Sequence, residues 1–208
     1  MVAHERSIIC REGWPWLIGA IIAWGVIFRI WGLVWSSPVL LLIGWLFFLF
    51  RDPGRDVLPL PLAIVAPVDG EVIEVVRYHD GIPPGKWTRI AIRTTHLGAY
   101  TVRSPIEGAI HDVGEEARDV DPARLTSGLW VRSEEQDDVV LLFPGRRRRF
   151  APKAFVRYGE RVGQGQRFAY LRLAPKAEVY LPATSVTRVH VGDRVLAGST
   201  VLAELAGK

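Results

Sequence analysis

A run of apolar residues near the N-terminus constrains the fold of this chain more than any other feature. Residues 14–35 (WPWLIGAIIAWGVIFRIWGLVW) are almost wholly apolar, and about 20 such residues are enough for a helix to cross a bilayer. Ser36-Ser37-Pro38 interrupts the run, and a second apolar stretch follows at residues 39–50. Because a helix breaker separates two apolar stretches, the sequence predicts a membrane-embedded helical hairpin over residues 14–50.

The depth of this hairpin has two interpretations. The second stretch is short for a span at a rise of about 1.5 Å per residue, so the hairpin either crosses the membrane or dips into one leaflet. Arg29 favours the shallower form because its guanidinium must reach water. A cleaved signal peptide does not fit a run this long. A buried helical hairpin in a soluble protein is the remaining alternative.

Either form of hairpin returns the chain to the side from which it entered. The short N-terminal segment, residues 1–13, and the soluble part, residues 51–208, then lie on the same side of the membrane. We expect that membrane to be the inner (cytoplasmic) membrane, with the soluble domain in the cytoplasm. The flanking charges agree with this orientation but do not determine it.

The charge of the chain indicates the kind of partner. The formal net charge is +4, which suits nucleic acid or anionic lipid. The apolar N-terminus favours lipid, and the chain has no base-stacking aromatic motif of the kind that RNA-binding sheets use. We therefore expect membrane phospholipid as a partner and no nucleic acid. The single cysteine, Cys10, excludes a disulfide framework and is either an incidental thiol or an acylation site beside the membrane.

The residues after Arg51 contain two pairs of related segments. APVDGEVIEV (66–75) is similar to SPIEGAIHDV (104–113), and GERVGQGQRFAYL (159–171) is similar to GDRVLAGSTVLAEL (192–205). Each segment is typical of a tight turn followed by a short strand. Such paired repeats resemble the sandwiched barrel of lipoyl and biotinyl carrier domains. We therefore expect a mainly β, barrel-sandwich-like domain, although no lysine at a hairpin tip supports a carrier function.

The order of several motifs resembles the phosphatidylserine decarboxylase family in its short, membrane-anchored form. After the hairpin, FRDPGRDVLP and PVDGEV precede RIAIRTTHLGAYTVRSPIEG, RSEEQDD and GQRFAYLRLAPKAEVYLP, and VHVGDRVLAGSTVLAEL follows. These pieces cover most of residues 39–205, and the match is weakest at 114–158. The resemblance implies a proenzyme that cleaves itself before a serine. That serine becomes a pyruvoyl group, which forms a Schiff base with the substrate amine and supports decarboxylation.

The residues that the family uses for self-processing are only partly present. The family acid is retained as Asp69, but Tyr100 replaces the family histidine, and Ala174-Pro175 replaces the family Gly-Ser. Proline has no side-chain oxygen or sulfur for the acyl shift, and tyrosine, with an ordinary pKa near 10, is a poor general base at neutral pH. The family pyruvoyl group is therefore predicted to be absent. The backbone at Pro175 suits the first residue of an edge strand.

Other candidate site residues are a histidine and several arginines. His96 lies four residues before Tyr100, and this even offset puts both on one face of a strand. The remaining histidines show no ligand spacing, so no metal site is predicted. The candidates for binding lipid headgroups are Arg103, Arg146, Arg147, Arg148 and Arg149. For the last four, a solvated turn is the alternative.

Three functions remain open. The leading hypothesis is a non-processing pseudoenzyme that binds aminophospholipid, either phosphatidylserine or another anionic lipid, or that regulates phospholipid metabolism. It would act as a homodimer or beside an active paralogue. The alternative is an enzyme. It is either an active lyase in phosphatidylethanolamine biosynthesis that works by a non-standard route, or an enzyme of different lipid chemistry that uses Asp69, His96 and Tyr100. The third is a membrane scaffold without a lipid pocket.

Overall fold

The chain divides into two compact units, Met1–Gly54 and Arg55–Lys208. This computed structural model describes residues 9–55, 60–78, 86–95, 98–111, 128–144, 152–171 and 174–206. Of the site residues predicted above, His96, Arg146, Arg147, Arg148 and Arg149 lie outside the described residues. The fold class predicted from the sequence, a mainly β protein with an N-terminal apolar helical segment, is confirmed.

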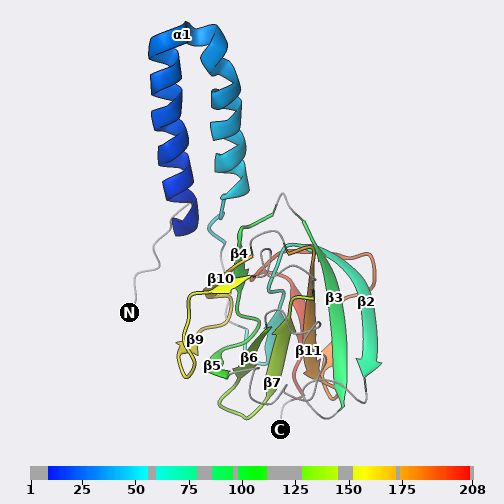
Figure 1. Ribbon diagram of the computed structural model, residues 1–208. Helices are drawn as coiled ribbons and strands as arrows, with labels where there is room; N and C mark the ends of the chain where they lie inside the picture. The colour runs from blue at the N-terminus through cyan, green and yellow to red at the C-terminus, as the bar shows by residue number, and fades with distance from the viewer. Residues whose placement is uncertain are drawn as a thin grey trace. The chain divides into compact units, whose positions relative to one another are not determined.

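The first unit is an apolar helix that folds back on itself. A 3-10 turn, η1 (Arg11–Gly13), leads into α1 (Trp14–Leu49), and Figure 1 shows two arms of α1 side by side with a short transverse part between them. The turn starts earlier than the predicted break, at Gly32, whose φ of 78° is costly for other residues. The hydroxyls of Ser36 and Ser37 then donate to Leu33 O (3.1 Å) and Val34 O (2.7 Å) just before Pro38.

The two ends of α1 meet at its base. Cys10 N–H donates to Phe50 O (3.1 Å), and a Cβ at Gly13 would lie 2.6 Å from the Phe50 side chain, so glycine is required there. Cys10 is 5% exposed, and this burial raises the pKa of its thiol to about 11. The thiol therefore stays protonated at neutral pH, which agrees with an incidental cysteine.

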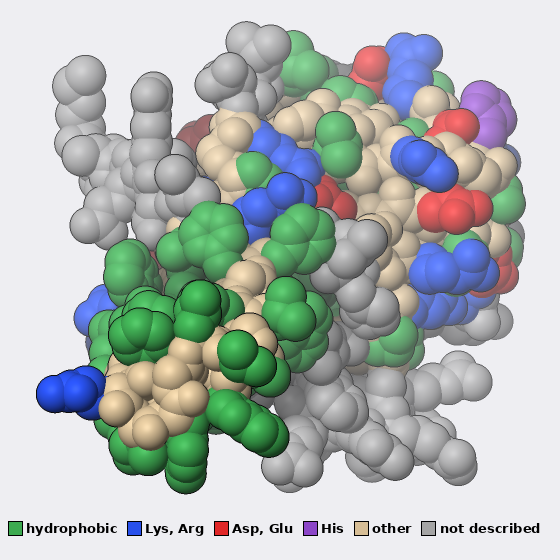
Figure 2. Space-filling model, turned by 90° about the horizontal axis from the view of Figure 1, so that it is seen from above, with side chains coloured by type: hydrophobic (Ala, Val, Ile, Leu, Met, Phe, Trp, Pro, Cys, Tyr) green, Lys and Arg blue, Asp and Glu red, His purple; other side chains and the backbone are tan. Residues whose placement is uncertain are grey.

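The outside of the hairpin is apolar. Val34, Trp35 and Leu41 are 81%, 73% and 78% exposed, and Figure 2 shows such hydrophobic side chains crowded over the hairpin. The most apolar 18-residue window has a mean hydropathy of 2.1, and only 6% of it is buried, unlike the core helix of a soluble protein. The helix is long and apolar enough to cross a membrane, and its exposed apolar surface suggests membrane association.

The second unit is mainly β. Its described strands form an eight-stranded sheet in the order β13-β2-β3-β11-β7-β6-β5-β9 and two three-stranded sheets, β1-β14-β12 and β4-β10-β8. The bounds are β1 (Ala63–Val65), β2 (Gly70–Tyr78), β3 (Trp87–Thr94), β4 (Thr101–Arg103), β5 (Gly108–His111), β6 (Gly128–Arg132), β7 (Asp138–Leu142), β8 (Lys153–Ala154), β9 (Arg161–Val162), β10 (Arg167–Tyr170), β11 (Lys176–Pro182), β12 (Val186–Thr187), β13 (Arg194–Val195) and β14 (Val201–Glu204).

The sheets are built from two copies of one structural unit. We call β4 to β10 the inner copy, because it is inserted between β3 and β11 of the outer copy, which comprises β1 to β3 and β11 to β14. Reading the large sheet from its two edges gives matching strands: β13, β2, β3 and β11 correspond to β9, β5, β6 and β7. The similar sequence segments therefore reflect a duplicated fold.

Backbone hydrogen bonds repeat at matching positions of the two copies. The N–H groups of Val72 and Ile110 donate to Asp193 O and Glu160 O at 2.9 Å each; those of Leu205 and Leu171 donate to Leu62 O (2.7 Å) and Tyr100 O (2.6 Å). Glycines with positive φ also recur, since Gly192 and Gly198 match Gly159 and Gly165. The match therefore extends to single residues.

The core lies between the sheets, and β11 crosses its centre. Ala177, Val179 and Leu181 occupy alternate positions along β11, and each is 0% exposed. The edge-strand interpretation is wrong, because β11 pairs with β3 on one side and with β7 on the other (Figure 1). Pro175 is tolerated because it precedes the first residue of the strand, where a missing N–H breaks no ladder bond.

Candidate functional site

Asp69 lies in the turn between β1 and β2, and its carboxylate is fully hydrogen-bonded. Oδ1 accepts from Arg55 Nη1 (2.7 Å) and Ala197 N–H (2.7 Å), and Oδ2 accepts from Arg55 Nη2 (2.6 Å) and Ala99 N–H (2.8 Å). Asp69 is 5% exposed. A buried carboxylate needs such partners, and this one joins three separate segments of the second unit.

Two glycines allow the backbone to pack around Asp69. A Cβ at Gly98 would lie 2.6 Å from Asp69 Cβ, and a Cβ at Gly70 would lie 2.1 Å from Arg93 O. Neither distance is possible for a real side chain. The glycine of the Pro-x-Asp-Gly turn is therefore required by the close approach of β3.

The Ala174-Pro175 segment lies against the end of β3. Thr94 N–H donates to Pro175 O (3.1 Å), and the Thr94 hydroxyl donates to Ala174 O. The next residue, Thr95, donates its N–H to Asp69 O (3.0 Å). Consecutive residues at the end of β3 therefore contact Asp69 and the Ala174-Pro175 segment, which the sequence predicts at the position of the family's Gly-Ser.

Tyr100 lies beside the same loop cluster. Its neighbour Ala99 donates to Asp69, its own carbonyl accepts from Leu171 N–H, and its ring lies 6.2 Å from the ring of Tyr170. The fold thus brings the loops of Asp69, Tyr100 and Pro175 together. The sequence reasoning missed two residues here, Arg55 and Thr94; a buried aspartate demands a cation, but the sequence did not show which one.

Arg103 lies inside the second unit. It is 4% exposed, and its Nη1 donates to Gly165 O (3.1 Å). This position does not present the guanidinium to a lipid surface. Within the described part of the chain, no group of three or more His, Cys, Asp or Glu side chains could hold a metal ion.

The second unit has a mainly β fold of the barrel-sandwich class, with the buried acid Asp69 near the segment that precedes β11. The exposed apolar helix of the first unit suggests membrane association. The chain is 31% identical over 209 residues to the phosphatidylserine decarboxylase proenzyme of Nitrosomonas eutropha, and the aligned region covers 97% of each of the two chains. It is 32% identical over 219 residues to the proenzyme of Burkholderia multivorans, covering 97% of this chain and 98% of the relative. The chain belongs to the phosphatidylserine decarboxylase family, as its motifs predicted.

Other comparisons add little. No protein-family model matches the chain. Among solved structures, the glucose permease IIA of Mycoplasma capricolum has a TM-score of 0.45 and 15% identity, and covers 68% of this chain and 94% of that one. This likeness is too slight to support a conclusion.

Proposed function

We propose that this chain is a non-processing member of the phosphatidylserine decarboxylase family that binds aminophospholipid at the membrane. The observation that carries the proposal is Ala174-Pro175, at the position of the family's Gly-Ser. Self-cleavage needs a hydroxyl or thiol that attacks the preceding carbonyl, and proline has neither. The nearby Thr94 hydroxyl donates a hydrogen bond to Ala174 O.

The surroundings of Asp69 support the same proposal. An acid that assists proton transfer needs an acceptor site free for the transferred proton. The Asp69 oxygens instead accept four hydrogen bonds, two of them from Arg55. Together with tyrosine at the histidine position, this favours a structural role for the retained acid.

The hairpin is proposed as the membrane anchor, with the β unit on the cytoplasmic face. Its exposed apolar side chains and the meeting of its two ends support an anchor that enters and leaves on one side. Protease treatment of spheroplasts tests the orientation: the β unit should be protected until the inner membrane is permeabilised. Digestion in intact spheroplasts would contradict it.

The test of non-processing uses the full chain, purified in detergent. We expect one species of about 23.3 kDa by intact mass, with no carbonyl that borohydride reduces. An active family member, expressed and purified in parallel, should give two fragments and serves as the control. Two fragments of this chain, cut near residue 174, would overturn the proposal.

Lipid binding is tested separately, in phosphatidylcholine nanodiscs that contain the full chain and a trace of fluorescent lipid. Energy transfer from the tryptophans should be stronger to labelled phosphatidylserine than to labelled phosphatidylcholine. Equal transfer to both lipids would leave a scaffold without lipid selectivity and would contradict this part of the proposal.

The second candidate is an active lyase that uses another route, and the retained Asp69 is the observation that favours it. Membranes that carry this chain, from cells that lack any other decarboxylase of the family, should then convert phosphatidylserine to phosphatidylethanolamine. The non-processing proposal predicts no conversion above membranes without the chain.

A further inference from the structure

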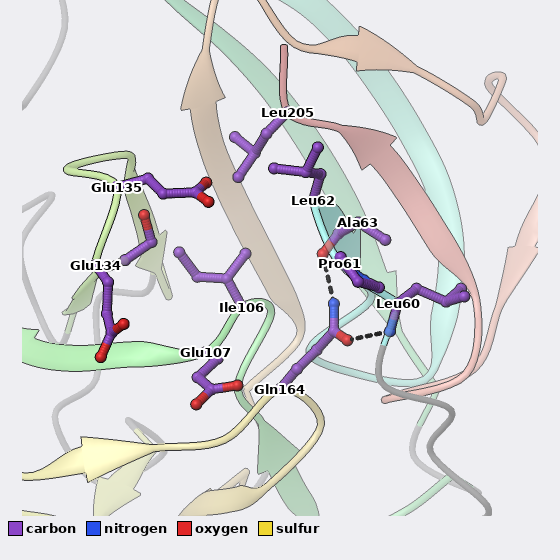
Figure 3. A pocket seen from close by; sticks show the side chains of 11 residues that line it. Leu60, Pro61, Leu62, Ala63, Ile106, Glu107, Glu134, Glu135, Gln164 and Leu205 are labelled. Atoms are coloured by element: carbon purple, nitrogen blue, oxygen red, sulfur yellow. Dashed lines mark hydrogen bonds between the residues drawn. The ribbon is translucent and has the colours of Figure 1, made fainter. Parts of the chain in front are cut away.

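A pocket of about 510 Å³ lies in the second unit, away from the loop cluster of Asp69. Leu62, Ile106 and Leu205 form part of an apolar wall, and Glu107 and Glu135 border it (Figure 3). In the figure, Glu135 and Glu107 lie on either side of Ile106, and the Glu135 carboxylate points toward Leu205. A pocket with an apolar wall and carboxylates at its border suits a ligand that is both apolar and positively charged.

The duplicated fold gives this pocket a counterpart. A Cβ at Gly108 would lie 2.1 Å from Arg132 O, as one at Gly70 would from Arg93 O, so Glu107 takes the place of Asp69. The backbone bond between Leu205 and Leu62 matches the bond between Leu171 and Tyr100. The bond from Ser133 N–H to Asp137 O (2.9 Å) matches that from Thr94 N–H to Pro175 O. The pocket is therefore the second copy of the loop cluster that contains Asp69, Tyr100 and Pro175.

The first copy shows what such a site binds. There, the Arg55 guanidinium lies on the Asp69 carboxylate, and its Nη1 also reaches Ala197 O (3.4 Å). In the second copy, Gln164 takes the place of Ala197. Its side-chain nitrogen donates to Ala63 O in β1, and its side-chain oxygen accepts from the N–H of Leu60, which precedes β1 (Figure 3). No side chain of the described residues forms an ion pair with Glu107, whereas Glu134 pairs with Arg161. In the first copy, the carboxylate that matches Glu107, that of Asp69, therefore already binds a cation.

We propose that this pocket binds a primary alkylammonium group that has no neighbouring carboxylate. The Glu107 carboxylate attracts an ammonium and repels the additional carboxylate of a serine headgroup. Glu135 adds negative charge at the border, and the apolar wall accommodates the alkyl carbons. An ethanolamine headgroup has this chemistry, either on a lipid or as the free amine. The inference rests on the proposed function in one respect, the choice of an aminophospholipid as the natural source of the amine.

The experiment titrates the full chain in detergent with ethanolamine, L-serine and ethylene glycol, and heat of binding is measured by calorimetry. Ethanolamine should bind saturably, and L-serine and the neutral diol should each bind at least about tenfold more weakly. Glu107→Gln and Glu135→Gln should each weaken ethanolamine binding about fivefold, as expected for a partly exposed ion pair. Glu71→Gln, at an exposed position of β2, is the matched control and should change nothing.

Three results would overturn the inference: no saturable ethanolamine binding, equal binding of L-serine, or binding that survives both pocket substitutions. Competition by nanodiscs with and without phosphatidylethanolamine then shows whether the amine is a lipid headgroup or free ethanolamine. If the lipid competes with free ethanolamine, the site takes the lipid headgroup; if it does not, the site takes the free amine. Intact mass is measured on the same samples, because a cut chain would refute the proposed function without affecting amine binding.

Discussion

The outer and inner copies of the β fold differ most at one position, the connection between their third strand and the next strand of the large sheet. In the inner copy, a tight turn over residues 133–137 joins β6 to β7. In the outer copy, the whole inner copy is inserted between β3 and β11, and it ends at Ala174-Pro175. The segment predicted to match the family's cleavage position therefore lies at an insertion point, where β11 is paired on both sides and does not depend on a turn.

The two copies also use their matching acids differently. Asp69 is buried and bound to Arg55, whereas Glu107 is exposed at the border of a pocket. At one of the two matching sites an internal ion pair therefore occupies the carboxylate, while at the other the carboxylate borders a pocket. The predictions below test this difference, from the largest expected effect to the smallest.

Arg55→Ala should have the largest effect, because it leaves the Asp69 carboxylate buried without its cation. Breaking a buried ion pair costs about 3 kcal/mol or more, which lowers the midpoint of thermal unfolding by about 6 °C in a domain of this size. The measurement is tryptophan fluorescence of the full chain in detergent. Glu107→Ala, the matched change in the other copy, should stay within about 0.5 kcal/mol. Equal effects of the two changes would contradict the difference between the sites.

Gly70→Ala and Gly108→Ala should destabilise the protein by similar amounts. In each case the new Cβ would meet a carbonyl oxygen of the neighbouring strand at 2.1 Å, and such overpacking costs about 1–3 kcal/mol. Thermal unfolding of the two variants, with Gly54→Ala as a control in open space, measures this. A large effect of only one variant would show that the copies are not equivalent at this turn.

Alkaline pH should reveal the charged network around Tyr180 on the outer copy. Burial, and then the charge of Glu178, raise the pKa of Tyr180 to about 12. Because the folded state holds this proton more tightly than the unfolded state, its contribution is complete below about pH 10. The contribution is lost as the pH rises from about 10 to 12.

The check is the unfolding midpoint between pH 9 and 12. Tyr180→Phe should remove the part of the alkaline decline that this phenol causes. Tyr158→Phe, at an exposed tyrosine, is the control and should leave the decline unchanged. An identical decline in the wild type and in Tyr180→Phe would contradict the prediction.

Pro175→Ser should have the smallest effect. Pro175 is exposed and precedes β11, so we expect stability to change by less than about 1 kcal/mol. The chain should also remain uncut, because tyrosine at the histidine position is a poor base at neutral pH. Intact mass after prolonged incubation measures this. Cleavage before residue 175 would show that the fold alone supplies the processing chemistry.

Much of the fold could be predicted from the sequence because it depends on local patterns. The apolar run and its break predicted a helical hairpin, and the two pairs of similar segments predicted a mainly β domain. The start of the turn at Gly32 was missed, since a glycine in an apolar run gives no sign that it adopts a positive φ. The central position of β11 was missed as well, because a proline before a strand is compatible with both an edge and a central strand.

The sequence by itself determined the family and the apolar N-terminal helix, and it predicted that Ala174-Pro175 stands where the family has Gly-Ser, since each depends on residue identity and order. Only the tertiary structure decided that Arg55 binds Asp69, how the strands of the two similar copies pair and that Glu107 borders a pocket. The hydrogen bond from Ala197 to Asp69 joins residues 128 positions apart. Such contacts follow from the pairing of distant strands, which no local pattern specifies.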